Sequence, residues 1–222
     1  MSGPPNAAAP VDLERRVAEV WDNARPIVRP SAVTSYLESR GVNRWPLPAA
    51  LRWQEHALPW ECLLGADEEP VRRTALVAAI TNRAQAMAGV VRFHFNQSFV
   101  EGRKPSPRAA LIACRSLYGC AVALGGPERG ALGLAGDVFS ALLAWQQTGV
   151  PTWAAYRPSE PAIRHITWPA GVRHLFLFVD DRPEVRLGVE RLAAHAARAG
   201  VRCELVDLST AGRLPAIAAA AA

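Results

Sequence analysis

Short apolar runs separated by helical patterns dominate the second half of the chain. The runs predict four strands, at residues 131–135, 152–155, 174–179 and 201–206. Apolar residues at helical spacing predict helices at 138–148 and at 183–198, where Pro183 takes a first-turn position. Strands that alternate with helices are typical of an α/β fold with a parallel sheet.

Carboxylates follow two of these strands. Asp180 and Asp181 come directly after 174–179, and Asp137 comes two residues after 131–135. An open parallel α/β sheet builds its site at the carboxyl ends of its strands. The pattern therefore predicts a site at this edge, although it supplies fewer carboxylates than such a site needs.

The first half of the chain has a different pattern. Residues 11–24 have apolar positions at helical spacing, and Ser31 is a favourable N-cap for a second helix that ends before Gly41. Residues 75–80 and 89–95 predict the two strands of a hairpin. The remaining stretches are interpreted as a proline-rich connection at 47–53 and a short strand at 119–124.

Composition limits the classes of function. Half of the 222 residues are apolar and a fifth are charged, which is ordinary for a globular protein. No apolar run reaches the ~18 to 20 residues that a membrane span needs, and residues 1–10 lack the regions of a signal peptide. We expect a cytoplasmic protein with no membrane contact. Its predicted parts are a disordered tail at 1–10, an N-terminal region at 11–125 and a second domain at 126–222.

Arginine supplies almost all of the positive charge. The net charge is +5, and Lys104 is the only lysine. Together with Arg92, Arg103 and Arg108 it forms the best candidate for a basic patch, around a proline-rich loop. Such a loop is either a solvated surface or a contact for the phosphate backbone of a nucleic acid, and the sequence leaves both interpretations open.

The first half also resembles a known family. Trp21 leads a helix, a proline follows, and then come Tyr-Leu-x-x-Arg-Gly-Val at 36–42 and Leu-Arg at 51–52. Arg92 and the Gly-Arg-Lys at 102–104 continue the match. These features resemble the N-terminal part of toprim-containing primase-like proteins of plasmids, phages and integrative elements.

The first strand and helix of the toprim domain are matched by residues 132–142. Where the family has Leu-x-Leu-Ala-Glu-Gly-Ile-Glu-Thr-Ala-Leu, this chain has Leu-Gly-Leu-Ala-Gly-Asp-Val-Phe-Ser-Ala-Leu. In the family, the first of these glutamates holds Mg²⁺ together with an Asp-x-Asp after the third strand. The resemblance places that glutamate at Gly136 and the second glutamate at Phe139, so both acids are missing.

The Asp-x-Asp of the family is half retained. Asp180 takes the place of its first aspartate, Asp181 the intervening position, and Arg182 the place of the second aspartate. A fixed positive charge there opposes the binding of a cation. No residue is predicted to be catalytic with certainty. Asp137, Asp180 and Asp181 are the candidates for a rearranged Mg²⁺ site, and Asp137 alternatively caps the helix that begins near Val138.

We therefore expect an α/β fold, with a toprim-like parallel sheet flanked by helices and a small N-terminal helical and β-hairpin region. The predicted partner is a nucleic acid, with single-stranded DNA favoured, or a replication or mobile-element protein. No cofactor is expected, although Mg²⁺ would bind if the carboxylate site functions. The predicted nucleic-acid contacts are Arg92, Arg103, Lys104, Arg108 and Arg182.

The resemblance implies a primase-like accessory protein of a mobile genetic element with a catalytically degenerate toprim scaffold. Two alternatives remain open. The first is a metal-dependent enzyme that transfers nucleotides or cleaves phosphodiesters with a rearranged carboxylate site. The second is a protein-interaction module that binds no nucleic acid. The missing glutamate and aspartate favour a pseudoenzyme over an enzyme but leave the choice undecided.

Overall fold

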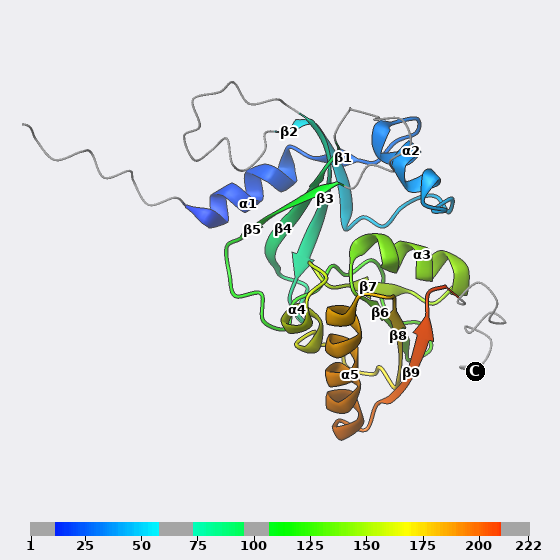
Figure 1. The fold of residues 1–222 in the computed structure, drawn as a ribbon. Coiled ribbons are helices and arrows are strands. Elements are labelled where there is room, and N and C mark those ends of the chain that lie inside the picture. Colours follow the sequence, from blue (N-terminus) through cyan, green and yellow to red (C-terminus); the bar gives the residue numbers. More distant parts are fainter. Residues whose placement is uncertain (1–11, 58–72, 96–106, 210–222) are drawn as a thin grey trace, which may run out of the picture.

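Two sheets and five helices make up the described part of the chain, which is residues 12–57, 73–95 and 107–209 of a computed structural model (Figure 1). The first sheet is antiparallel, with the order β1 (Arg25–Pro26), β2 (Leu51–Ala57), β3 (Arg73–Thr81), β4 (Met87–His94), β5 (Arg108–Ala113). The second is parallel, with the order β7 (Thr152–Ala154), β6 (Ala131–Ala135), β8 (His174–Val179), β9 (Arg202–Asp207). The helices are α1 (Leu13–Asp22), α2 (Ala32–Ser39), α3 (Val138–Thr148), α4 (Glu160–Arg164) and α5 (Pro183–Arg198).

The parallel sheet flanked by helices confirms the predicted fold class. The helices of the chain begin and end at local signals in the sequence. The side chain of Ser31 accepts a hydrogen bond from the backbone N–H of Thr34, whose hydroxyl accepts one from the Ser31 N–H, so α2 begins with a complete capping box. Helix α3 ends at Gly149, which has a φ of 77°, the left-handed conformation that glycine adopts without a steric penalty.

The antiparallel sheet is larger than the sequence predicts. The proline-rich connection expected at 47–53 runs into β2, and Arg108, expected in a loop, is the first residue of β5. The strand expected at 119–124 is also wrong, because this segment makes only isolated bridges, from Ala121 to Thr81 and from Val122 to Ala154. Since Thr81 is the last residue of β3 and Ala154 the last of the edge strand β7, the segment links the end of a central strand of one sheet to the edge of the other.

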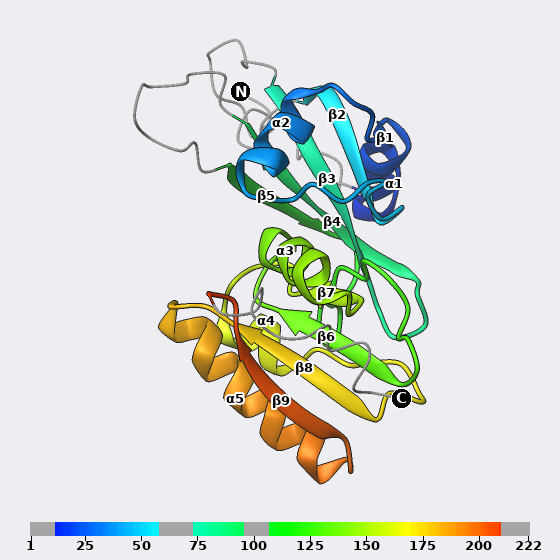
Figure 2. The same cartoon turned by 90° about the vertical axis from the view of Figure 1, so that its right-hand side faces the viewer.

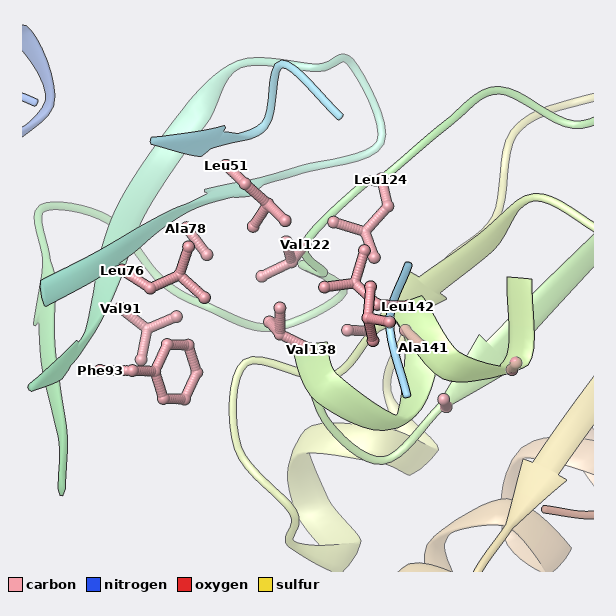
Figure 3. Packing of buried hydrophobic residues seen from close by; sticks show 14 of the residues in the cluster. Leu51, Leu76, Ala78, Val91, Phe93, Val122, Leu124, Val138, Ala141 and Leu142 are labelled. Carbon is pink, nitrogen blue, oxygen red and sulfur yellow. The ribbon is translucent and has the colours of Figure 1, made fainter. Parts of the chain in front are cut away.

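Helix α3 lies between the two sheets, and the largest core of the described chain surrounds it (Figures 2 and 3). Val138, Ala141 and Leu142 of α3 are almost completely buried and point toward the antiparallel sheet. On the other side of α3, the core includes Phe176 and Phe178 of β8. A single hydrophobic cluster therefore contains residues of both sheets.

Two further clusters cover the outer faces of the sheets. Leu175 and Leu177 of β8 alternate with its phenylalanines and pack on the side of α4 and α5, as period-two alternation requires. Val17 and Val20 of α1 pack on the face of the antiparallel sheet away from α3. Each sheet is thus covered on both faces. Within the described ranges, no helix has the length and apolar composition needed to cross a membrane.

The shared core makes a prediction about stability. Leu142 is 3% exposed within this core, and Leu142→Ala should lower the free energy of unfolding by about 2–5 kcal/mol, because it leaves a cavity between the sheets. Urea unfolding monitored by circular dichroism measures the change. Leu205→Ala is the matched control, since Leu205 on β9 is 54% exposed and should change stability by less than about 0.5 kcal/mol. Equal effects of the two substitutions would contradict the proposed packing.

Candidate nucleic-acid interface

The ends of β6 and β8 bring three charged residues together. The two strands are parallel neighbours, with Ala135 opposite Phe178. Asp137 therefore leaves the sheet at the same edge as Asp180 and Arg182, which lie 43 and 45 residues further along the chain. This is the edge at which the sequence predicts a site.

Asp137 caps helix α3. Its Oδ1 accepts a hydrogen bond from the backbone N–H of Ser140 at 2.9 Å, and its Oδ2 lies 3.2 Å from the Ser140 hydroxyl. This confirms that Asp137 has the capping role that the sequence allows. One oxygen, Oδ2, also faces the loop that follows β8.

The guanidinium of Arg182 lies between the two carboxylates. Its Nε is 3.0 Å from both carboxylate oxygens of Asp180, and its Nη2 contacts Oδ2 of Asp180 as well as Oδ2 of Asp137, the latter at 2.5 Å. The backbone N–H of Arg182 also donates to Oδ1 of Asp180 at 3.0 Å. Two carboxylates and one guanidinium form a charge cluster that is 15–35% exposed by side chain.

The charge cluster keeps Asp180 and Arg182 ionised. Burial alone would raise the pKa of Asp180, but hydrogen bonds from Arg182 and its charge outweigh burial and lower that pKa below its usual value. The hydrogen bond to Asp180 and the charge of Asp137 raise the pKa of Arg182 despite its partial burial. The stabilisation from Asp180 is therefore present above the unfolded pKa of about 3.9 and is lost as the pH falls through the lower folded pKa.

The residues at this edge do not fit a divalent cation. The Arg182 guanidinium lies between the two carboxylates that would have to face the ion, and like charges repel. Asp181 is fully exposed, with Arg186 as a cation 3.8 Å away. No group of three histidine, cysteine, aspartate or glutamate residues able to hold a metal ion occurs in the part of the chain that the structure describes.

Gly136, at the position of the missing glutamate, is closely covered. A Cβ atom added there would lie 2.9 and 3.0 Å from the two γ-carbons of Val185 on α5. A glutamate at this position would therefore require Val185 to move. The neighbouring helix fills the space that a side chain would need.

Phe139, at the position of the second missing glutamate, belongs to an aromatic cluster. Its ring centroid lies 4.9 Å from that of Phe93 on β4 and 5.3 Å from that of Tyr36 on α2, both in edge-on orientations. Phe95 adds a fourth ring, 4.9 Å from Tyr36. The replacement of an acid by Phe139 thus contributes to packing between the sheets.

A pocket of about 440 Å³ opens between this aromatic cluster and the charge cluster. Its lining includes Tyr36, Arg40, Phe93, Asp137, Phe139 and Arg182. We call it the rim pocket. The guanidinium of Arg40 lies 5.4 Å from the centre of the Tyr36 ring. Aromatic rings beside arginines suit the bases and phosphates of a nucleic acid.

Most of the lining of the rim pocket was missed at the sequence level. Tyr36 and Arg40 belong to the Tyr-Leu-x-x-Arg segment, but nothing in the sequence placed them against Phe139. Their spacing of four puts both on one face of the predicted helix, which is the only available signal. Phe93, expected in a hairpin strand, gave none.

Most of the predicted basic patch lies outside the residues that the structure describes. Arg103 and Lys104 lie outside them, and so does the side chain of Arg108. Arg92 is 3% exposed, and it alternates on β4 with Phe93, so it faces α1 and not the rim pocket. Burial and the nearby charge of Arg16 lower the pKa of Arg92. Its Nε and Nη2 are buried without a hydrogen-bond partner.

Comparison with known proteins identifies the family. The model of a domain of unknown function, DUF7146, matches residues 11–124, more than half of the chain. The chain belongs to this family. The matched region of the DUF7146 chain covers the antiparallel sheet with α1 and α2. No curated protein matches it.

Solved structures of bacterial primases share the fold of this DUF7146 protein. The DnaG primase catalytic domain bound to single-stranded DNA matches with a TM-score of 0.54 and 11% identity, over 92% of this chain and 73% of that one. A DNA primase domain from Pseudomonas aeruginosa matches with 0.52 and 12%, over 88% and 70%. The Aquifex aeolicus primase matches with 0.51 and 14%, over 88% and 54%. The fold is that of primase catalytic cores.

The charge cluster leads to a testable expectation. Arg182→Ala would leave two facing carboxylates without their cation, and we expect the free energy of unfolding to fall by about 2 kcal/mol, since bonds to charged groups contribute about 1.5–3 kcal/mol and partial exposure reduces this. Arg186→Ala is the control, because its ion pairs lie at the surface and should contribute no more than about 1 kcal/mol. Urea unfolding at neutral pH distinguishes the two. An Arg182→Ala protein as stable as the wild type would show that the cluster does not stabilise the fold.

Proposed function

We propose that this DUF7146 protein binds nucleic acid, with single-stranded DNA favoured, through a primase-like scaffold that no longer synthesises primers. The position of Arg182 between Asp137 and Asp180 carries this proposal. The guanidinium of Arg182 occupies the place between the two carboxylates where a metal ion would bind, and its positive charge repels such an ion. Aromatic and arginine side chains of the rim pocket remain available to a nucleic acid.

The rim pocket offers one accessible ring and two arginines to a nucleic acid. Phe139 is half-buried there, whereas Tyr36 and Phe93, which pack against it, are only 8% and 7% exposed. Arg40 has no carboxylate partner among the described residues. Arg182 uses Nε and Nη2 for the carboxylates, which leaves Nη1 available for a phosphate oxygen. The predicted contacts at Arg103, Lys104 and Arg108 would extend the positive surface along the backbone of a strand. Arg92 would add to it only if its guanidinium became accessible.

The biological setting rests on the sequence resemblance. Primase-like proteins of plasmids, phages and integrative elements begin with the Tyr-Leu-x-x-Arg-Gly-Val segment found at 36–42. We propose that the protein works in the cytoplasm as an accessory factor in the DNA replication of such a mobile element, where it binds single-stranded DNA or a replication protein.

Salt-dependent binding tests the nucleic-acid part of the proposal. A fluorescein-labelled oligothymidylate of about 16 nucleotides should bind in EDTA, with an affinity that falls between about 50 and 200 mM KCl as phosphate counterions are released. Fluorescence anisotropy measures both. Lys104→Ala should weaken binding and make the salt slope shallower by roughly one unit. Arg40→Ala should also weaken binding.

The control for this test is Arg15→Ala, whose side chain is 77% exposed on α1 and pairs with Glu19. It should leave the affinity unchanged. Absence of oligonucleotide binding at low salt would exclude the proposed function and leave the protein-interaction module as the alternative.

Magnesium binding tests the loss of catalysis separately. We expect no heat of binding when the wild-type protein is titrated with millimolar Mg²⁺ or Mn²⁺ in a calorimeter, because Arg182 opposes a cation between its two carboxylates. Arg182→Asp removes the competing charge and supplies a third carboxylate, so this variant should bind Mn²⁺ more tightly than the wild type. Metal-dependent product formation from nucleotides or DNA that disappears in Asp180→Ala would instead establish the enzyme alternative.

A further inference from the structure

Two pairs of rings lie outside the rim pocket, and the second pair lines a hollow with Val172 and Val201, which come just before β8 and β9 at the amino end of the parallel sheet. Tyr118 and His165 have ring centroids 4.3 Å apart, and Trp168 and His195 have theirs 5.5 Å apart. The charge of His195 acts weakly on His165, so the two pairs belong to the same region of the protein. The rings come from three separate segments: the loop after β5, the loop between α4 and β8, and the last turn of α5.

The loops that carry these rings are held together. The Thr167 hydroxyl donates to the carbonyl oxygen of Gly119 at 2.8 Å, and the Thr167 N–H donates to the same oxygen at 3.3 Å. Gly119 has a φ of 76°, and a Cβ atom there would lie 3.2 Å from Thr167. These contacts hold the loop that carries Tyr118, whose side chain is 70% exposed. A large aromatic ring held in solvent has little to contribute to the core.

His165 presents an uncharged face to Tyr118. Nε of Arg164 donates to Nε2 of His165 at 2.8 Å, which requires that Nε2 carries no proton. Partial burial and the charge of Arg164 both lower the pKa of His165. His165 is thus a neutral ring at physiological pH, suited to stacking beside Tyr118.

A hollow of about 340 Å³ adjoins the second pair of rings. It is lined by Trp168 and His195, by Pro169 and Gly171 of the same loop, and by Arg83 from the turn between β3 and β4. Figure 2 shows this hairpin reaching the end of the parallel sheet at which β6 and β8 begin. The antiparallel sheet therefore supplies a cation, Arg83, to a surface built mainly by the parallel sheet.

Two arginines border His195 on α5. Arg191, His195 and Arg198 are exposed and follow one another at spacings of four and three, so they form one stripe of the helix. Glu160 accepts from both Arg191, at 2.5 Å, and Arg164, at 3.1 Å. Two cations share one carboxylate, so this group keeps a net positive charge, to which Arg83 and Arg198 add.

We propose that these residues form a second binding surface for single-stranded nucleic acid, which we call the distal surface: Tyr118, His165, Trp168, His195, Arg83 and Arg191. Tyr118 and His195 are exposed and His165 and Trp168 are half-buried. Such rings beside cations offer stacking platforms for bases and charges for phosphates, without reading the sequence. β8 has six residues, so at about 3.3 Å per residue the two ends of the sheet are about 20 Å apart. The distal surface is therefore separate from the rim pocket and does not depend on it.

Substitution of Tyr118 tests the distal surface directly. Because Tyr118 is exposed, Tyr118→Ala should fold normally, and loss of a stacking platform should weaken binding of the labelled oligothymidylate roughly 5-fold to 100-fold. Arg83→Ala should weaken it as well and make the salt slope shallower by roughly one unit. Val28→Ala, at another residue that is 55% exposed, should change nothing. Wild-type affinity in Tyr118→Ala and Arg83→Ala would overturn the proposal.

Photo-cross-linking separates the two surfaces. An oligothymidylate that contains 4-thiothymidine should cross-link to peptides that contain Tyr118 and Trp168, as identified by mass spectrometry, and a duplex of the same length should compete weakly. Cross-links confined to peptides with Arg40 or Phe139 would overturn the distal surface and support the rim pocket. Cross-links only at Tyr118 and Trp168 would support the distal surface and count against the rim pocket. Equal competition by duplex would exclude base stacking at the distal surface.

Discussion

The packing of α3 on both of its sides is the constraint on which the rest of this structure depends. Leu142 and Val138 close the core against the antiparallel sheet (Figure 3). Strand β8, which carries the core residues Phe176 and Phe178, lies on the other side of the helix (Figure 2). Because the shared core is closely packed, neither sheet can shift relative to the other without disturbing it. As a result Asp137, the N-cap of α3, is fixed at the rim where the two sheets meet. The rim pocket is a consequence of this packing, since its walls come from α2, β4 and α3.

The differences from the toprim pattern form a consistent set. Val185 covers Gly136, Phe139 packs against rings of the other sheet, and Arg182 binds the carboxylates of Asp137 and Asp180. At each of these positions the residue present is satisfied by a contact with its neighbours. An unpaired carboxylate or a cavity there would cost stability. The carboxyl end of the sheet is a neutralised, packed edge within a fold shared with primase catalytic cores.

The two ends of the parallel sheet have different physical characters. At the carboxyl end, Arg182 is paired with two carboxylates, which leaves little uncompensated charge. At the amino end, Arg83 lies in the hollow of Trp168 and His195, and Arg83 and Arg198 have no ion pair among the described residues, so positive charge is in excess there. Long-range attraction of a phosphate backbone depends on such uncompensated charge. The antiparallel sheet reaches both ends, through Phe93 at one and Arg83 at the other.

The sequence by itself determined the parallel half of the fold, because its signals are local. Buried strands such as β6 and β8 are continuous apolar runs, and helix ends are set by neighbours such as Asp137 and Gly149. It did not determine β2, a largely polar stretch, or β5, a short run directly after Pro107. Both become strands by pairing with β3 and β4. The sequence placed Arg182 where a metal ligand belonged, but only the tertiary structure brought it to Asp137, 45 residues away. Such contacts depend on packing between distant segments, and no local pattern encodes them.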